Sequence, residues 1–497
     1  MLPEEREVKL EASPSFQLPQ LGELGNGMTA TVREPERLLT VYLDTNDLRL
    51  TRWGVSLRHR HGQGWTLKLP ADGSEDLLVR TELPFDGAAR RPPEAAVDLI
   101  RGYVRAAELV PQVRLRTTRR GVEIRDRDGK LLADVVDDEV SVLDGRRVAA
   151  RFRELEVEAT PDTPAGLVEQ IVERLRAGGA GAPDPTPKVV RALGSRAPQQ
   201  PEVPVVGLGR GPKAGDVVSR AIAISVDRLI RHDVVVRLDA DPEGVHQARV
   251  ATRRLRSDLR TFAPLVAADW SRELRDELGW LADTLGRVRD ADVMLERLHG
   301  RVAELPEAST RGAERVLDTL LKQRTEALAE LLEVLQSERY FSLLDRCVEA
   351  ARAPALVGDA RLPAADVLPA LVRRPWRKLE KAVKALGDPP TDEDLHWVRI
   401  GAKRCRYAAE AVAPAVGKRA RAFARAAAEL QQVLGDHNDA VVAERWLRDW
   451  AAVGRSPAAI FAAGELAGLE RAAAEATRAG WRKAWKRFAA PKLRAWM

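Results

Sequence analysis

The chain of 497 residues is poor in cysteine and has no long apolar run. Its two cysteines, Cys347 and Cys405, exclude a disulfide framework and a cysteine-rich metal site. No stretch of about 18 apolar residues is present that would span a bilayer, and the first residues do not resemble a signal peptide. We therefore expect a soluble protein in a reducing, cytoplasmic compartment, with no membrane partner.

The sequence also lacks a helix-turn-helix, a zinc finger and an RNP-type aromatic motif, so nucleic acid is the least favoured partner. Charged residues make up 31% of the chain, yet the net charge is only +6. An excess this small is important only where the positive charge is concentrated locally. The informative segments are therefore those that gather cations.

One basic pattern occurs twice in the second half of the chain. The segment from His246 to Arg256 (HQARVATRRLR) recurs 150 residues later, from His396 to Arg406 (HWVRIGAKRCR). Each copy is followed by a Leu-Gly pair and then an aspartate, Asp290 after the first and Asp439 after the second. Two blocks in the same order at nearly the same offset indicate a duplicated unit.

Each copy of the basic pattern predicts a cationic stripe, because positions i, i+3, i+7 and i+10 share one face of a helix. Like charges on one face repel unless an anion lies on them, and a long polyanion is the natural complement. The two histidines lack the partners of a transition-metal site, so we expect them to hydrogen-bond phosphate. We expect Asp290 and Asp439 to cap helices or to pair with the arginines. The candidate polyanion-binding residues are His246, Arg249, Arg253, Arg254, Arg256, His396, Arg399, Lys403, Arg404 and Arg406.

The composition divides the chain into two domains joined by a linker. Residues 196–215 are rich in proline, glycine and glutamine, as is typical of a linker. Residues 216–497 contain long Ala/Leu/Arg/Glu segments and predict an all-α domain of two repeated helical bundles, in which the basic segment 481–488 is a packed terminal helix. Residues 1–195 have the alternation of strands, with helices expected at 94–107 and 164–177. The expected strands are residues 5–11, 38–44, 55–60, 65–69, 112–118, 121–126, 130–136 and 151–159.

Charges alternate with apolar residues along several of these strands. Glu5, Glu7 and Lys9 point to one side of a strand, since side chains alternate with period 2. Adjacent carboxylates on one face are costly unless a cation lies between them. Arginines share a face at 58 and 60 and at 114 and 116, and glutamates do so at 154, 156 and 158. This pattern fits a barrel with a polar interior, where carboxylates hold Mg²⁺ or Mn²⁺ and cations hold phosphate oxygens.

The segments Glu5–Lys9, Tyr42–Thr45, Leu57–Arg60, Thr66–Lys68 and Glu156–Glu158 resemble the CYTH domain, the triphosphate tunnel metalloenzyme family. The resemblance covers most of residues 1–195. It implies an eight-stranded antiparallel β tunnel barrel with flanking helices, which binds a triphosphate and Mg²⁺ or Mn²⁺. Members of the family include inorganic triphosphatases, thiamine triphosphatases and class IV adenylate cyclases.

The resemblance also implies roles for single residues. Lys9, Glu5 and Glu7 match the catalytic region. Asp138 matches the acidic residue of a later strand, and Asp137 is the alternative for that position. Glu156 and Glu158 match the closing pair of carboxylates, for which Glu154 is a weaker candidate. Either Arg116 or Arg119 would continue the cationic set. The implied metal-binding residues are Glu5, Glu7, Asp138, Glu156 and Glu158, and the implied triphosphate-binding residues are Arg58, Arg60, Lys68, Arg80, Arg116, Arg119 and Lys188.

The helical repeats resemble the CHAD domain, the conserved histidine α-helical domain, over roughly residues 216–490. His246 and His396 with their trailing basic residues carry this resemblance. It implies binding of inorganic polyphosphate rather than catalysis, and it makes polyphosphate granules a candidate location.

The leading hypothesis is therefore a metal-dependent triphosphatase coupled to a polyphosphate-binding module, with water as the nucleophile. One alternative is a non-catalytic polyphosphate-binding protein whose first domain is a further anion site. The chain keeps both complete sets, Glu5, Glu7 and Lys9 and then Glu156 and Glu158, which argues against a first domain that has lost its metal chemistry. Another alternative is an adenylate cyclase, for which the sequence has no visible adenine-reading motif.

Overall fold

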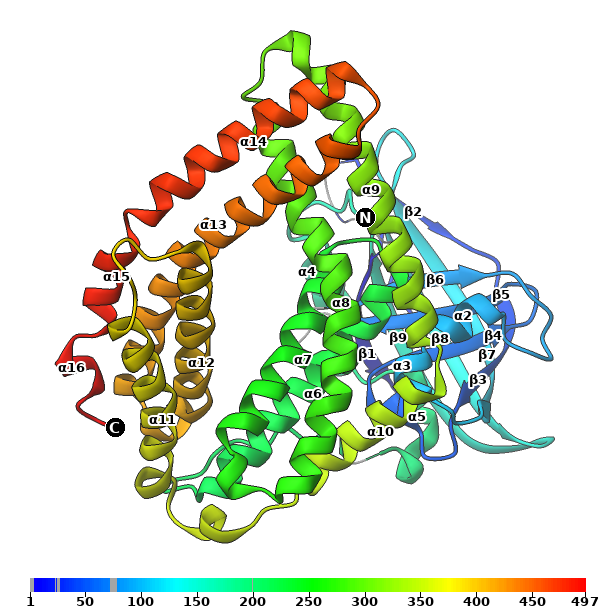
Figure 1. Ribbon diagram of the computed structural model, residues 1–497. Coiled ribbons are helices and arrows are strands. Elements are labelled where there is room, and N and C mark those ends of the chain that lie inside the picture. Colours follow the sequence, from blue (N-terminus) through cyan, green and yellow to red (C-terminus); the bar gives the residue numbers. More distant parts are fainter. Residues whose placement is uncertain (1–3, 23, 25–26, 72–77, 199) are drawn as a thin grey trace. The chain divides into compact units, whose positions relative to one another are not determined.

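The computed structural model describes residues 4–22, 24, 27–71, 78–198 and 200–497 (Figure 1). The chain divides into two compact units, residues 1–202 and residues 203–497. The first contains all the strands, and the second is helical. Within the described residues, no helix has the length and apolar character needed to cross a membrane.

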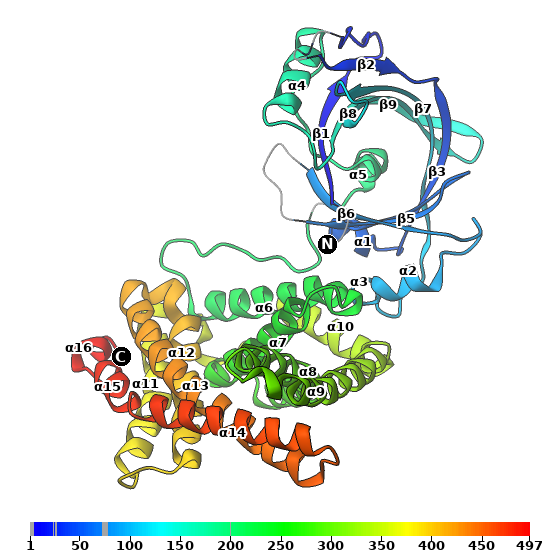
Figure 2. The same ribbon diagram turned by 90° about the horizontal axis from the view of Figure 1, so that it is seen from above.

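The first unit is built on an antiparallel barrel. Its strand order is β2-β7-β3-β4-β5-β6-β1-β9-β8, and an additional pairing of β7 with β8 closes eight strands into a ring, with β2 outside it on β7. The predicted eight-stranded antiparallel barrel is thus confirmed, and Figure 2 gives a view into it. The strands are β1 (Glu4–Ala12), β2 (Thr29–Val32), β3 (Glu36–Asp44), β4 (Ser56–Arg60), β5 (Gly64–Pro70), β6 (Leu78–Phe85), β7 (Val110–Arg125), β8 (Leu131–Asp144) and β9 (Arg147–Ala159).

Alternation along β1 and β9 gives the barrel two different faces. Lys9 is opposite Glu156, and the next pair along, Leu10 and Leu155, points the other way. Leu10 and Leu155 are fully buried in a cluster with Ile171 of helix α4 (Leu167–Ala177), which covers that face. The apolar side chains therefore pack outward under the helix, and the charged ones point into the barrel.

A short helix, α5 (Lys188–Leu193), lies inside the ring of strands (Figure 2). Val189 and Leu193 of α5 pack against Val113 and Leu115 of β7 in an apolar cluster. This cluster fills one part of the barrel and fixes Lys188, the first residue of α5, in a buried position. The remaining helices of this unit are α1 (Arg49–Arg52), α2 (Glu94–Leu99), α3 (Arg101–Val104) and the 3₁₀ turn η1 (Gly194–Arg196).

The first unit extends beyond the predicted boundary at residue 195. Glu202 is buried, accepts a 2.7 Å hydrogen bond from Trp53 Nε1, and forms an ion pair with Arg105. The division between the two units falls after Glu202, within the segment 196–215 that was predicted as a linker.

The second unit repeats one order of helices. The basic segments lie on α7 and α12, and the Leu-Gly pairs lie on α8 and α13. α7 contacts α12, and α9 lies beside α14 (Figure 1). The helices are α6 (Ala214–Leu238), α7 (Glu243–Thr261), α8 (Ala268–Val302), α9 (Glu307–Leu335), α10 (Glu338–Arg352), α11 (Ala364–Lys384), α12 (Asp392–Val416), α13 (Lys418–Val453), α14 (Pro457–Arg478), α15 (Trp481–Phe488) and α16 (Pro491–Arg494), with 3₁₀ turns η2 (Ala263–Leu265) and η3 (Gly358–Arg361).

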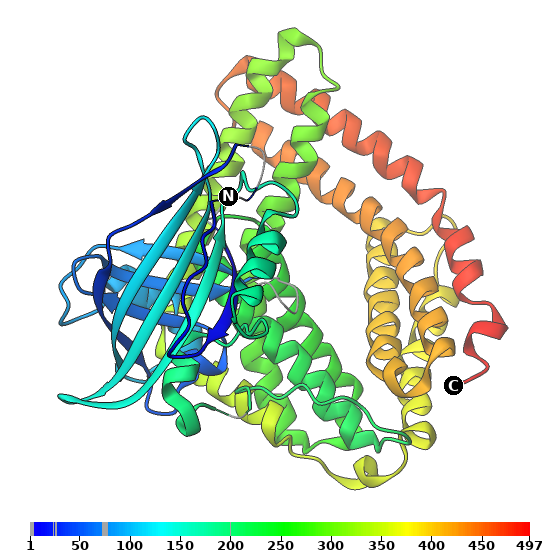
Figure 3. The same cartoon turned by 180° about the vertical axis from the view of Figure 1, so that it is seen from behind.

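The terminal basic segment is a packed helix, as its composition predicts. α15 and α16 contact α13 (Figure 3). Trp485 of α15 stacks on Trp376 of α11 with ring centroids 5.6 Å apart, and Phe488 meets the same indole edge-on. The apolar face of this helix is therefore occupied by the protein itself.

Candidate functional site

The interior of the barrel gathers charged side chains from most of its strands. Strands β1, β4, β5, β6, β7 and β9 each contribute at least one, and α5 adds Lys188. The cavity is lined by Glu5, Lys9, Tyr42, Ser56, Arg58, Arg60, Lys68, Arg80, Arg119, Glu156, Glu158 and Lys188. Almost all of the first-unit residues proposed from the sequence thus meet in one place.

One side of the cavity is a network of buried ion pairs. Lys9 pairs with Glu156, and Lys188 Nζ lies 2.5 Å from an Asp138 oxygen. Arg119 donates two hydrogen bonds to Asp138, at 2.9 and 2.7 Å. Burial opposes the charged form of Lys188, but Glu156 and Asp138 outweigh it and raise the pKa of this lysine. These cations remain charged at neutral pH.

Asp138 and Glu156, which the resemblance implied as metal-binding residues, are both held in ion pairs with cations. Asp138 is completely buried between Arg119 and Lys188, and Glu156 lies between Lys9 and Arg119. Both carboxylates neutralise and orient cations, and neither belongs to the group of carboxylates able to share one ion among the described residues.

That group consists of Glu5, Glu7 and Glu158, whose ligand atoms all lie within 4.8 Å of one another. The backbone brings them together, since Glu7 is opposite Glu158 in the pairing of β1 with β9. Burial raises the pKa of Glu158 to about 7, and the charges of Glu156 and Glu5 contribute to the shift. Among the described residues Glu158 has no ion pair or hydrogen bond of its side chain, so an oxygen-preferring divalent cation fits this donor set.

The opposite wall carries cations with fewer carboxylates. Lys68 lies 2.5 Å from Glu5, and Arg58 lies 3.2 Å from Glu82. Arg60 has no carboxylate within ion-pair distance among the described residues. Burial, together with Arg58 and Arg119, lowers the pKa of Arg60 to about 10. A cationic site this crowded favours the binding of an anion with several charges.

Arg116 is the one proposed first-unit residue that the structure places elsewhere. It is exposed on β7, whereas Arg119, three residues further along, faces the cavity. An odd spacing along a strand puts two side chains on opposite faces, so the choice between them falls on Arg119. Asp137 likewise points away from the cavity and is held by Arg153 at 2.8 and 2.7 Å.

Two polar lining residues, Tyr42 and Ser56, were not proposed as site residues. Burial would raise the pKa of the Tyr42 hydroxyl, but Arg58 and Lys188 outweigh burial and lower it. Tyr42 belongs to the motif that suggested the family. The observation that could have identified Tyr42 as a lining residue is its position on the face of β3 that points into the barrel.

The basic stripes of the second unit meet where α7 contacts α12. The charges that act most strongly on Lys403 are those of Arg253, Arg399 and Arg249, which come from both repeats. Burial, followed by these charges, lowers the pKa of Lys403 to about 7. We call Arg249, Arg253, Arg399 and Lys403 the central cluster.

The repeated glycines explain how the arginines of the central cluster are accommodated. A Cβ on Gly286 would lie 3.7 Å from Nε of Arg249, and one on Gly435 would lie 3.7 Å from Nε of Arg399. In both repeats the guanidinium thus lies close against a residue that has no side chain. A bulky residue at either position would displace the arginine.

The aspartates and histidines of the repeated pattern have different surroundings in the two repeats. Asp290 pairs with Arg249 at 3.0 Å, whereas Asp439 accepts a hydrogen bond from Asn438. His396 Nδ1 is 2.6 Å from the Asn438 side-chain oxygen. Burial and the nearby charge of Arg289 lower the pKa of His246.

Arg254 and Arg404 are not part of the central cluster. Arg254 pairs with Asp258 at 3.2 Å and with Glu410. Arg404 is exposed and lines a separate cavity beside α11. Neither arginine lies on the stripe positions i, i+3, i+7 and i+10, which explains the difference.

Comparison with known proteins assigns both units to families. The CYTH domain family matches residues 3–187, and the CHAD domain family matches residues 220–448. An uncharacterized protein of Mycobacterium tuberculosis is 32% identical over 472 residues, which are 88% of this chain and 86% of that protein. The chain therefore belongs to the proteins that combine an N-terminal CYTH domain with a C-terminal CHAD domain.

Two solved structures are similar to part of the chain. PptA from Streptomyces chartreusis is 26% identical, with a TM-score of 0.47, over 55% of this chain and 99% of that one. The CHAD domain from the plant Ricinus communis is 28% identical, with a TM-score of 0.46, over 56% of this chain and 95% of that one.

Proposed function

We propose that the first unit is a metal-dependent triphosphatase acting on inorganic triphosphate or a similar triphosphate. One observation carries the proposal: the barrel lining combines a wall of cations with an adjacent trio of carboxylates, Glu5, Glu7 and Glu158. Guanidinium and ammonium groups suit phosphate oxygens, and converging carboxylates suit Mg²⁺ or Mn²⁺.

In this proposal Glu5, Glu7 and Glu158 hold the ion, which when bound neutralises phosphate charge and lowers the pKa of water. Arg58, Arg60 and Lys68 orient the triphosphate. Transfer of a phosphoryl group to water depends mainly on such positioning and charge neutralisation.

Lys9 and Arg80 keep the carboxylates in place. Lys9 Nζ is 3.5 Å from Glu7, and Arg80 Nη2 is 2.5 Å from the other oxygen of Glu7. Both cations are buried beside Glu7, so they hold its carboxylate in position.

The test is phosphate release by the full chain from tripolyphosphate, thiamine triphosphate, ATP and long-chain polyphosphate, each with Mg²⁺ and with Mn²⁺. We expect metal-dependent release from at least one triphosphate. Absence of release from all four compounds with either metal would contradict the proposal.

One observation favours a non-catalytic alternative. Glu5 and Glu7 already pair with Lys68 and Arg80, both at 2.5 Å, and such pairs can replace a metal ion. In that case the barrel binds tripolyphosphate without hydrolysing it. Calorimetric binding of tripolyphosphate in EDTA, with no turnover after addition of either metal, identifies this outcome.

We further propose that the central cluster of the second unit binds inorganic polyphosphate. The supporting observation is that cations of both repeats converge at the contact of α7 with α12, where burial and mutual repulsion lower the pKa of Lys403. An anionic polymer that reaches both repeats relieves this repulsion.

Length dependence tests this second proposal. The full chain should bind a hundred-unit polyphosphate far more tightly than tripolyphosphate, and its affinity should fall as salt rises, as for other polyanions that release counterions. Replacing Arg253 and Lys403 together by alanine should remove most of the difference. Equal affinity per molecule for the short and the long chain would show that the repeats do not act together.

A further inference from the structure

The duplication gives the second unit two equivalent cavities, of which one includes Arg253 of the central cluster in its lining and the other includes no residue of that cluster. One, the α11 pocket, has a volume of about 550 Å³ and is lined by α7, α11 and α12. The other, the α6 pocket, has a volume of about 500 Å³ and is lined mainly by α6, α7 and α12. Leu371, Arg374, Lys378, Ile400 and Arg404 of the first correspond, at the offset of the sequence repeat, to Ala221, Ile224, Arg228, Val250 and Arg254 of the second.

The two pockets differ in how their arginines are neutralised. In the α6 pocket, Arg254 is paired with Asp258 and Glu410. In the α11 pocket the residue equivalent to Glu410 is Arg260, and the residue equivalent to Asp258 is Ala408. Both carboxylates have thus been replaced, one of them by a cation.

The α11 pocket consequently gathers four cations and no carboxylate. Arg260, Arg374, Lys378 and Arg404 all line it, and none of them forms an ion pair among the described residues. The charge of Arg404 contributes, after burial, to a lowered pKa of Arg260. Four unpaired cations around one cavity repel one another, and an anion with several charges removes that repulsion.

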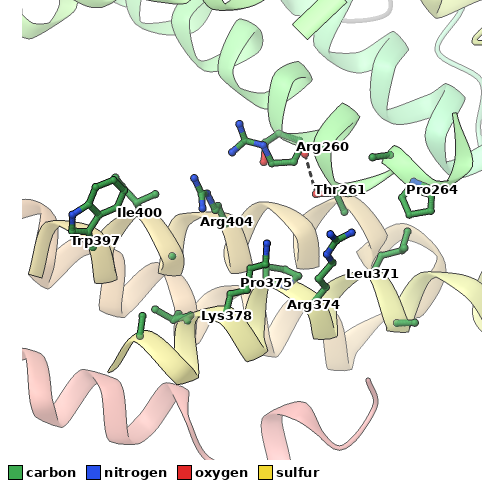
Figure 4. Close-up of a pocket in the computed structure, with 16 residues that line it drawn as sticks. Arg260, Thr261, Pro264, Leu371, Arg374, Pro375, Lys378, Trp397, Ile400 and Arg404 are labelled. Carbon is green, nitrogen blue, oxygen red and sulfur yellow. Dashed lines mark hydrogen bonds between the residues drawn. The ribbon is translucent and has the colours of Figure 1, made fainter. Parts of the chain in front are cut away.

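The remainder of the lining is apolar. Leu371, Pro375, Leu379 and Ile400 contribute, and Trp397 is 57% exposed. Figure 4 shows Arg260 of α7 and Arg404 of α12 on either side of the same space, with Trp397 and Ile400 at one end. An exposed indole beside cations is the arrangement on which a nucleic acid base stacks. A ligand that fits must combine a flat apolar part with several negative charges.

We propose that the α11 pocket binds a nucleoside polyphosphate, with the base against Trp397 and Ile400 and the phosphates on Arg260, Lys378 and Arg404. The volume is in the range of small-molecule sites. Inorganic polyphosphate would engage the cations but leave the apolar surface uncovered, so the pocket should prefer the nucleoside compound. This proposal does not depend on the activity of the barrel.

The experiment is titration calorimetry of ATP into the full chain at 0.15 M salt with EDTA, which prevents metal-dependent hydrolysis. Lys378→Glu and Arg404→Glu should each weaken ATP binding at least about tenfold. Arg377→Glu is the matched control, because Arg377 is an exposed residue of α11 that does not line the pocket. It should change the affinity less than about twofold, since salt screens distant surface charges.

Two further variants separate this pocket from other phosphate sites. Trp397→Ala should weaken ATP binding about tenfold and leave tripolyphosphate binding unchanged, as expected for loss of stacking. Arg58→Ala, which alters only the barrel, should leave the ATP site of the second unit intact. The proposal is overturned if ATP binding is absent, if it disappears in Arg58→Ala, or if the ATP binding that remains in Arg58→Ala is unchanged when either both glutamate substitutions or Trp397→Ala are added.

Discussion

Glu7 of β1 and Glu158 of β9 are directly opposite each other in an antiparallel pair of barrel strands. One carboxylate oxygen of each, together with one of Glu5, lies within 4.8 Å of the other two. Burial raises the pKa of Glu158 to about 7, with further contributions from Glu156 and Glu5. A proton and a divalent cation therefore compete for the same carboxylates.

This competition predicts the pH dependence of metal binding. As pH falls below about 7, Glu158 becomes protonated, so Mn²⁺ affinity should fall by up to about tenfold per pH unit. Calorimetric titration of Mn²⁺ into the protein between pH 5.5 and 8 measures this change in affinity. In Glu158→Gln the affinity should be weaker, and its dependence on pH near 7 should be lost. An affinity of the wild type that stays constant over this range would disprove the assignment of Glu158 to the metal.

Replacing Arg58 tests which residues bind the triphosphate. Its side chain lines the cavity and pairs with Glu82 at 3.2 Å. Arg58→Ala should weaken substrate binding by about 1.5–3 kcal/mol, the scale of a hydrogen bond to a charged group. The measurement is the Michaelis constant for tripolyphosphate. Arg116→Ala, on the outer face of β7, is the control and should change nothing. An unchanged Michaelis constant in Arg58→Ala would make its ion pair purely structural.

Proton uptake provides a test of the central cluster. Lys403 has its pKa lowered to about 7 by burial and by Arg253 and Arg399, so it is largely neutral at pH 8. Bound polyphosphate favours the charged form and raises this pKa. Binding at pH 8 should therefore take up close to one proton, and affinity should rise as pH falls from 8.5 to 7. Calorimetry in two buffers of different ionisation enthalpy measures the uptake.

Lys403→Arg is the matched variant, because arginine remains charged throughout this pH range. It should bind polyphosphate with little proton uptake. The same uptake in this variant as in the wild type would place the titrating group elsewhere.

The alternation of charged and apolar residues was sufficient to predict most of the barrel and the inward direction of Glu5, Glu7, Lys9 and Arg58. It did not reveal β2, which has four mostly exposed residues, or β6, which contains Pro84 and pairs with both β1 and β5. The predicted strands 112–118 and 121–126 are one strand, β7. With two separate strands, the choice between Arg116 and Arg119 stayed open. On one continuous strand their odd spacing places the two side chains on opposite faces, so only one of them can face the cavity.

Tertiary partners far apart in sequence account for the rest. The helical period predicted the stripes, but not that Arg254 pairs with Glu410 of the other repeat. Nor did the pattern predict that Asp138 pairs with Lys188, 50 residues later in the chain. The contrast between Arg260 and Glu410 is present in the sequence, four residues beyond the end of the repeated pattern. Its meaning depends on the packing of α7 against α12.

The most direct test of the account is the rate of phosphate release from tripolyphosphate, measured against Mn²⁺ concentration, for the wild type and for Glu5→Gln combined with Glu7→Gln. The two amides keep the size of the side chains and remove the charge that holds the metal. The account predicts that metal-dependent turnover falls by at least about 100-fold in the folded variant. Turnover equal to that of the wild type would contradict it.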